Sequence, residues 1–193
     1  MLKGKKVVLR SFKEDDAASL HELKQDIESY KAFLGYPFPS NIDSEKEWIN
    51  KMYPPGLRDS VYLAIEIIKT GKFGGYCVAR NINYLNKTSE IGIIFTKDVR
   101  GKGYFIEISF LFYHYLFNQL NIQKVFSLVL EENKDSITSS LKLGFKEEGF
   151  LKNHIFQDGI YKNVFFISLF NNEFYQNFKK NFELYNYLLE NKS

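Results

Sequence analysis

The sequence of 193 residues contains one cysteine, Cys77. A single cysteine excludes an internal disulfide framework and a paired-thiol metal site, and such a chain suits a reducing cytoplasm. No apolar run approaches the roughly 20 residues needed to span a bilayer. The first residues, Met1–Lys6, lack the apolar core of a signal peptide. We therefore expect a cytoplasmic protein with no membrane partner.

A strong excess of one charge is also absent, because the formal net charge is only +3 and the lysines are spread along the chain. Nucleic-acid-binding domains show a basic stripe or patch, so we expect no nucleic-acid partner. The three histidines, His21, His114 and His154, fall on separate expected elements without metal-ligand spacing, which argues against a metal site. An anionic small ligand needs only a local positive patch and stays possible.

The hydrophobic pattern predicts one globular domain without internal repeats or low-complexity linkers. We expect helices from Lys13 to about Ile27, around Trp48 with Asp43 or Ser44 as the cap, and over Phe105–Leu116 and Asp135–Leu143. We expect strands over Lys6–Arg10, Val61–Ile67, Gly74–Arg80, Ser89–Phe95, Lys124–Leu130 and Asn163–Phe170. This order predicts the α/β (α+β) class, with a mixed, mostly antiparallel sheet of about six to seven strands flanked by helices.

The end of the chain has its own pattern. Aromatic residues recur every three or four positions after residue 172, at Phe174, Phe178, Phe182 and Tyr185. This spacing predicts an amphipathic C-terminal helix over residues 173–193 that packs on the domain formed by residues 1–172. A dimer contact through the same helix is the alternative, so we expect a monomer or a homodimer.

The most informative segment runs from Glu90 to Glu107 and combines a strand, a basic glycine loop and a helix. Gly101 and Gly103 permit tight turns, and N–H groups at the following helix start can point at one anion. Arg100 and Lys102 add positive charge at the same place, which suits a pyrophosphate. Taken alone, the pattern is equally compatible with a tight turn before a core helix. It matches neither a P-loop nor a complete dinucleotide fingerprint.

A second segment at a suitable distance strengthens the case. Arg100-Gly-Lys-Gly-Tyr resembles the acyl-CoA loop of GNAT acetyltransferases, whose pattern is [QR]-x-x-G-x-[GA]. Asn133 followed by Lys142-Leu-Gly-Phe is similar to the segment after the fifth strand of that family. The opening Val8–Asp16, the strand Glu90–Ile93 and the ending Phe156–Tyr161 are similar to the branch of ribosomal-protein N-terminal and spermidine acetyltransferases. The resemblance covers roughly residues 5–170.

The resemblance implies a GNAT-like fold and acetyl-CoA as the co-substrate. Backbone groups of Ile93, Ile94, Phe95 and Thr96 are then expected to bind the pantetheine arm, with Asn133 near its end. The pyrophosphate is expected on the loop Arg100, Gly101, Lys102, Gly103, Tyr104 and Phe105. Two positions depart from the family: Phe105 replaces a glycine or alanine, and Ser140 replaces a tyrosine that many members carry.

Acyl transfer from a thioester requires a neutral amine and a route for one proton. Glu90 is the candidate base, directly or through a water molecule, and a purely structural carboxylate is the alternative. Ser136 is the candidate hydroxyl near the thioester, and a first-turn residue that satisfies backbone groups is its alternative. A backbone N–H near Ile94 or Phe95 is the candidate for stabilising the oxyanion.

The acceptor site is expected in the front of the domain, where aromatic residues can wall a pocket for an amine: Tyr36, Phe38, Trp48 and Tyr84. Asp43, Glu45 and Glu47 are expected to cap and solvate a helix, with attraction of a polyamine as the alternative. The sequence thus predicts an N-acetyltransferase acting on a primary amine of a small molecule, polyamine, amino sugar or peptide N-terminus. The alternatives are a ribosomal-protein N-terminal acetyltransferase, a non-catalytic acyl-CoA-binding domain and a purely structural interaction protein.

Overall fold

The computed structural model describes residues 1–35 and 38–181. The described residues form a mixed α/β fold with eight strands, mostly antiparallel, and flanking helices, in agreement with the predicted fold class. The chain divides into two compact units. The first contains Met1–Ile82 and Ile91–His114, and the second contains Asn83–Glu90 and Tyr115–Ser193. In the described part of the chain, none of the helices has the length and apolar character needed to span a membrane.

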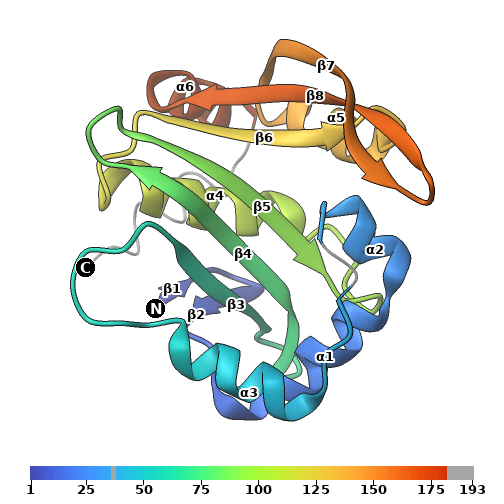
Figure 1. Ribbon diagram of the computed structural model, residues 1–193. Helices are drawn as coiled ribbons and strands as arrows, with labels where there is room; N and C mark the ends of the chain where they lie inside the picture. The colour runs from blue at the N-terminus through green and yellow to red at the C-terminus, as the bar shows by residue number, and fades with distance from the viewer. Residues whose placement is uncertain (36–37, 182–193) are drawn as a thin grey trace. The chain divides into compact units, whose positions relative to one another are not determined.

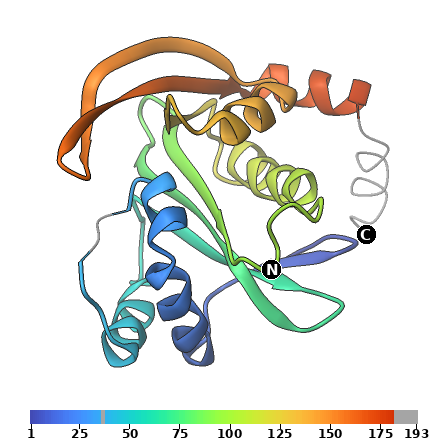
Figure 2. The same cartoon turned by 90° about the vertical axis from the view of Figure 1, so that its right-hand side faces the viewer.

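The first unit carries most of the helices. It holds β1 (Leu2–Lys3), β2 (Val7–Arg10), a 3-10 turn (Glu14–Asp16), α1 (Ala17–Gln25), α2 (Ile27–Ala32), α3 (Ile42–Lys51), β3 (Val61–Ile67), nearly all of β4 (Lys72–Asn83), the end of β5 (Thr88–Phe95) and the start of α4 (Phe105–Asn118). Its strands follow the order β1-β2-β3-β4-β5, and β1 to β4 pair antiparallel. Helices α1 and α3 lie side by side (Figures 1 and 2).

The core of the first unit lies between these two helices and the strands. Successive side chains of a strand point to opposite faces, so Tyr76 and Val78 share one face of β4 while Cys77 takes the other. Tyr76 and Val78 join a buried cluster with residues of α1, α3, the neighbouring strands and the segment after β2: Phe12, Ala17, Leu20, Leu23, Ile49, Ala64 and Ile94. Cys77 is fully buried on the opposite face.

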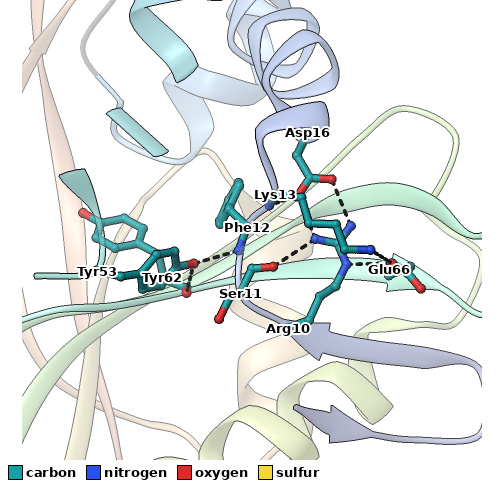
Figure 3. Close-up of polar contacts among 8 residues, drawn as sticks. All are labelled: Arg10, Ser11, Phe12, Lys13, Asp16, Tyr53, Tyr62 and Glu66. Atoms are coloured by element: carbon teal, nitrogen blue, oxygen red, sulfur yellow. Dashed lines mark hydrogen bonds and ion pairs between the residues drawn. The ribbon is translucent and has the colours of Figure 1, made fainter. Parts of the chain in front are cut away.

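The chain between β2 and α1 is fixed by a buried polar network (Figure 3). The Arg10 guanidinium donates to both carboxylate oxygens of Asp16, at 2.7 and 2.9 Å, and to Glu66 at 2.6 Å. The Tyr53 hydroxyl accepts from the Phe12 N–H at 2.8 Å and donates to the Tyr62 carbonyl at 3.1 Å. These contacts attach the start of α1 to β3, so the opening motif of the sequence has a structural role.

The second unit contains the start of β5 and the end of α4, followed by β6 (Lys124–Leu130), α5 (Lys134–Lys142), β7 (Lys146–Gln157), β8 (Ile160–Phe170) and α6 (Asn171–Asn181). β5 pairs parallel with β6, and β8 pairs antiparallel with both β6 and β7. β7 and β8 form a long curved hairpin (Figure 2). The sequence did not predict β1 or β7, which explains why the predicted strand number was too low.

The predicted C-terminal helix is present as α6. Phe174 and Phe178 are fully buried, and the Phe174 ring lies 5.3 Å from the ring of Phe117 at the end of α4. Phe182 and Tyr185, which the prediction also used, lie outside the described residues.

Two predicted helix boundaries were wrong. The cap of α3 is Asn41, whose Oδ1 accepts from the Ser44 N–H at 2.8 Å while the Ser44 hydroxyl oxygen accepts from the Asn41 N–H at 3.0 Å. Ser44 is therefore the third helical residue of a capping box rather than the cap itself. The first helix does not continue to Ile27 but ends at Gln25, because Asp26 has a non-helical ψ of 81°.

Candidate active site

The end of β5 carries the residues predicted to bind the pantetheine arm. Ile94 is buried, and Ile93, Phe95 and Thr96 are half-buried. The Thr96 N–H donates to the Gly74 carbonyl at 3.0 Å. At the next residue of β4, a Cβ on Gly75 would lie 2.0 Å from the Ile94 carbonyl oxygen, so only glycine fits there. The backbone of β4 thus leaves no room for a side chain beside Ile94, where the oxyanion-stabilising N–H was predicted.

The loop between β5 and α4 is built from consecutive turns. The N–H groups of Val99 and Arg100 donate to the Thr96 carbonyl at 3.0 and 3.3 Å, and the Lys102 N–H donates to the Val99 carbonyl at 3.4 Å. Gly101 and Gly103 have φ angles of 71° and 75°, a region that disfavours residues with a Cβ. The glycines therefore let the loop turn twice immediately before α4 begins.

The donors at the start of α4 suit an anion. Within residues 1–35 and 38–181, the N–H groups of Gly101, Gly103 and Tyr104 donate to no other group. A Cβ at either glycine would meet no atom within 4 Å, so the backbone here faces open space. The positive end of the helix dipole adds to the charges of Arg100 and Lys102. These residues fit a bound diphosphate.

Phe105, which departs from the family pattern, packs against the end of β5. Its half-buried ring lies edge-on to Phe95, with centroids 6.3 Å apart. Two residues later, the buried Glu107 carboxylate accepts from the N–H groups of Lys6 and Val7 at 2.7 and 3.2 Å. The first turn of α4 is therefore fixed on β2 and β5, and the Phe105 side chain is accommodated inside the first unit.

Asn133 and Ser136 lie in the second unit and interact with each other. Asn133 is the N-cap of α5, and its Oδ1 accepts from the Ser136 N–H at 3.2 Å. Ser136 thus lies in the first turn of α5, but this bond uses its backbone N–H, so both roles considered for its hydroxyl stay predictions. Ser140 on the same helix is buried.

The loop before Asn133 is held by residues that the sequence did not indicate. The Asn163 side chain donates to Glu131 and accepts from the Asn153 N–H, both at 2.9 Å, and Lys162 contacts Glu132 at 2.6 Å. Asn153 lies at a register shift of the β7–β8 ladder, and no local sequence signal marks this pairing.

Glu90, the candidate base, is half-buried on β5. Its backbone lies opposite Phe126 in the parallel pairing of β5 with β6. Its roles as base or as structural carboxylate both stay predictions.

The predicted acceptor residues have different environments. Tyr36 lies outside the described residues, Phe38 is 78% exposed, and Tyr84 of the second unit is 37% exposed. Trp48 is half-buried and packs edge-on to Phe12 and Tyr62, at centroid distances of 5.9 and 5.2 Å. Trp48 is therefore part of the aromatic core of the first unit, and its role as a pocket wall stays a prediction.

Glu45 has an environment that the sequence analysis did not anticipate. Its side chain is buried and its Oε2 accepts from the Lys24 ammonium at 2.7 Å, while Lys24 also lies 4.7 Å from the centroid of the Trp48 ring. Asp43 and Glu47 are exposed as expected, but the expectation of a solvated carboxylate was wrong for Glu45. Its spacing of three and four residues from Trp48 and Ile49 was the available signal, because such residues share one helix face.

Comparison with known proteins decides the family. A model of the acetyltransferase (GNAT) domain matches residues 6–146. The chain belongs to the GNAT acetyltransferase family. The predicted class, an acyl-CoA-dependent N-acetyltransferase that uses acetyl-CoA, is confirmed at this level.

Relatives within the GNAT family cover most of the chain. The spermidine N(1)-acetyltransferase of Escherichia coli (strain K12) is 24% identical over 168 residues, 87% of this chain and 88% of the relative. A Bacillus subtilis (strain 168) protein, provisionally named a ribosomal N-acetyltransferase, is 23% identical over 171 residues, 86% of this chain and 92% of the relative. The crystal structure of the spermidine N-acetyltransferase from Vibrio cholerae with CoA and spermine has a TM-score of 0.81 and 23% identity, and covers 89% of this chain and 99% of that one. The similarity to this crystal structure shows that the two proteins share one fold.

Proposed function

We propose that this GNAT enzyme transfers an acetyl group from acetyl-CoA to a primary amine of a polyamine, by direct attack in a ternary complex. Binding of acetyl-CoA is supported by one observation: the N–H groups of Gly101, Gly103 and Tyr104 donate to no group of the described residues and are available to an anion. The acceptor class is supported by the names of the relatives from Escherichia coli and Vibrio cholerae.

In this proposal, the N–H groups of the loop hold the pyrophosphate, Lys102 adds charge from an exposed position, and Arg100, which is paired with Asp26, supports the loop. Backbone groups of Ile93–Thr96 bind the pantetheine arm, and Phe105 supports the end of β5 through its contact with Phe95. Asn133 is proposed to contact the cofactor near its pantetheine end. Fixing the thioester in this way removes translational freedom from the reaction, which is a large part of catalysis by orientation.

The reaction requires the amine nitrogen to attack the thioester carbonyl, the C–S bond to break and the amine to lose one proton. Glu90 accepts this proton directly or through a water molecule. The leaving CoA thiolate takes a proton, and Ser136 is the candidate donor. An N–H near Ile94 or Phe95 stabilises the oxyanion.

The cofactor site is tested by calorimetric titration with acetyl-CoA. Lys102→Glu, an exposed charge reversal in the loop, is expected to weaken binding by about three- to tenfold. Lys69→Glu, the same reversal at an exposed position after β3, is the matched control and should leave the affinity within about twofold. Equal affinities of the two variants, or no binding by the wild type, would contradict the proposed cofactor site.

The acceptor is tested by following thiol release with spermidine, spermine, an amino sugar and a peptide with a free N-terminus. Turnover on the polyamines supports the proposal. Turnover only on the peptide favours an N-terminal acetyltransferase, the second candidate, which the name of the Bacillus subtilis relative supports. Cofactor binding without turnover on any amine favours the non-catalytic alternative.

Assembly and location are further parts of the proposal. One structure of the Vibrio cholerae relative is described as dodecameric, so association of copies of this chain is a reasonable expectation beyond the predicted monomer or homodimer. Light scattering of the purified protein measures the mass of the assembly, and hence the number of copies in it. The buried single thiol of Cys77 is compatible with the predicted cytoplasmic location.

A further inference from the structure

Asp26 occupies the junction between α1 and α2. Its N–H donates to the carbonyls of Glu22 and Leu23, both at 3.3 Å, and its carbonyl accepts from the Tyr30 N–H at 3.0 Å. Asp26 thus ends one helix and begins the next. Its side chain is 13% exposed and points to the loop that follows β5, from which two cations reach it.

Three donors surround the Asp26 carboxylate. The Ser29 hydroxyl donates at 2.5 Å, the Arg100 guanidinium donates to the same oxygen, and the Lys97 ammonium lies 3.6 Å from the other oxygen. Burial alone would raise the pKa of Asp26, but the hydrogen bonds from Ser29 and Arg100 and the charges of Arg100 and Lys97 lower it below its ordinary value. The carboxylate is therefore ionised at neutral pH and attracts both loop cations.

Arg100 is held at two points, because its Nε also donates to the Phe95 carbonyl at 3.4 Å. The guanidinium therefore connects the last residue of β5 with the α1–α2 junction. The open N–H donors of Gly101 and Gly103 follow directly in the chain. Arg100 is therefore the first residue of the segment proposed to bind the pyrophosphate.

An apolar contact attaches the other end of α2 to β5. The Phe33 ring packs edge-on to Tyr76, with centroids 5.5 Å apart. A Cβ on Gly92 would lie 2.5 Å from this ring, so Phe33 covers β5 directly at that residue. Residues 26–33 are thus fixed to β5 by Phe33 and to the following loop by Asp26, a few residues before two of the predicted acceptor residues, Tyr36 and Phe38.

We propose that Asp26 is a positioning residue for the acyl-CoA loop, acting through Arg100 and Lys97. It holds both side chains on the α1–α2 side of the loop, so that backbone N–H groups rather than the guanidinium face the pyrophosphate. A loop held in its binding arrangement loses less conformational freedom when the cofactor binds. This inference rests on the proposed function, since it assumes that the loop binds acetyl-CoA.

The test measures CoA affinity by calorimetry for the wild type, Asp26→Ala, Arg100→Ala and the double variant. Each single variant is expected to weaken CoA binding by about fivefold, and the double variant by little more, because both changes remove one interaction. Glu28→Ala, which removes the same charge from an exposed position two residues away, is the matched control and should bind within about twofold of the wild type.

Steady-state kinetics separate positioning from a general structural effect. The KM for acetyl-CoA should rise in Asp26→Ala while kcat stays within about twofold, and Asp26→Glu should restore part of the affinity. Asp26→Asn keeps the size of the side chain and serves in place of Asp26→Ala if that variant melts at a lower temperature than the wild type.

Three results would overturn the inference. Tighter CoA binding by Asp26→Ala would show that the carboxylate competes with the cofactor for Arg100. Additive losses in the double variant would show that the two residues act separately, and unchanged affinity would show that Asp26 plays no part. A wild type that does not bind CoA would instead refute the proposed function, so the two failures are distinguishable.

Discussion

Arg10 is a single residue on which much of the first unit depends. It is 8% exposed and contacts Asp16 and Glu66, so its removal would leave the buried Asp16 without its cation. We expect Arg10→Met to lower the free energy of unfolding by about 3–5 kcal/mol, measured by urea denaturation. Lys13→Met, whose ammonium lies 3.6 Å from Glu66 but is 62% exposed, should cost less than about 1 kcal/mol. Similar small losses in both variants would contradict this account.

The acid stability of the protein should depend on Glu66. The hydrogen bond from Arg10 lowers the pKa of Glu66 against the effect of burial, and the charges of Arg10 and Lys13 lower it further. A lowered pKa in the folded state adds stability at neutral pH, which is lost as the pH falls from about 5 through the lowered value. The difference in unfolding free energy between wild type and Glu66→Gln should therefore shrink as the pH falls through this range. A constant difference would argue against the linkage.

At the scale of elements, α3 offers a direct test of helix capping. Asn41→Ala removes the side chain that accepts from Ser44 and should lower the unfolding free energy by about 1 kcal/mol. Asp43→Ala changes a side chain that is 91% exposed and should cost less than about 0.5 kcal/mol. Both losses of unfolding free energy are measured from the shift of the urea denaturation midpoint, provided that the m-values of the variants and the wild type are equal. A larger loss of unfolding free energy for Asp43→Ala than for Asn41→Ala would instead favour Asp43 as the helix cap, one of the two residues that the sequence suggested.

The strands whose bounds the sequence predicts best are rich in β-branched and apolar residues. β3 and β6 match their predicted bounds, because Val61–Ile67 and Lys124–Leu130 are β-branched, apolar runs. β7 was missed because charged residues open it and its register with β8 shifts between Leu151 and Ile155, which breaks the two-residue alternation.

In the candidate site too, features with a local sequence signal were predicted and features that depend on distant residues were missed. The glycine loop at Gly101 and Gly103 was found because its conformational requirement is local and visible in the residue types. The break at Asp26 was missed, since the carboxylate is held by Arg100, 74 residues away in the chain. Asn163 was missed for the same reason, because its partners Glu131 and Asn153 come from separate segments.

At the scale of the whole molecule, the C-terminal helix should contribute to stability rather than to assembly. Phe174 is fully buried against Phe117 and Phe178, so Phe174→Ala should lower the unfolding free energy by about 3–5 kcal/mol. Phe156→Ala, at a 61% exposed aromatic residue of β7, should cost about 1 kcal/mol or less.

The mass measured by light scattering should be the same for the wild type and Phe174→Ala, because this ring packs within its own unit. A variant that loses mass without losing stability would favour the alternative in which the helix forms a contact between copies of the chain.

The burial of Cys77 has a consequence for an enzyme whose product is a thiol. The side chain is fully buried on β4, and burial raises the pKa of the thiol well above its ordinary value. The thiolate is the reactive form, so the folded protein should not exchange with oxidised CoA, the CoA disulfide, to form a mixed disulfide. A thiol-specific reagent added to the native enzyme should therefore count product molecules alone, and the same reagent in denaturant should count one additional thiol per chain.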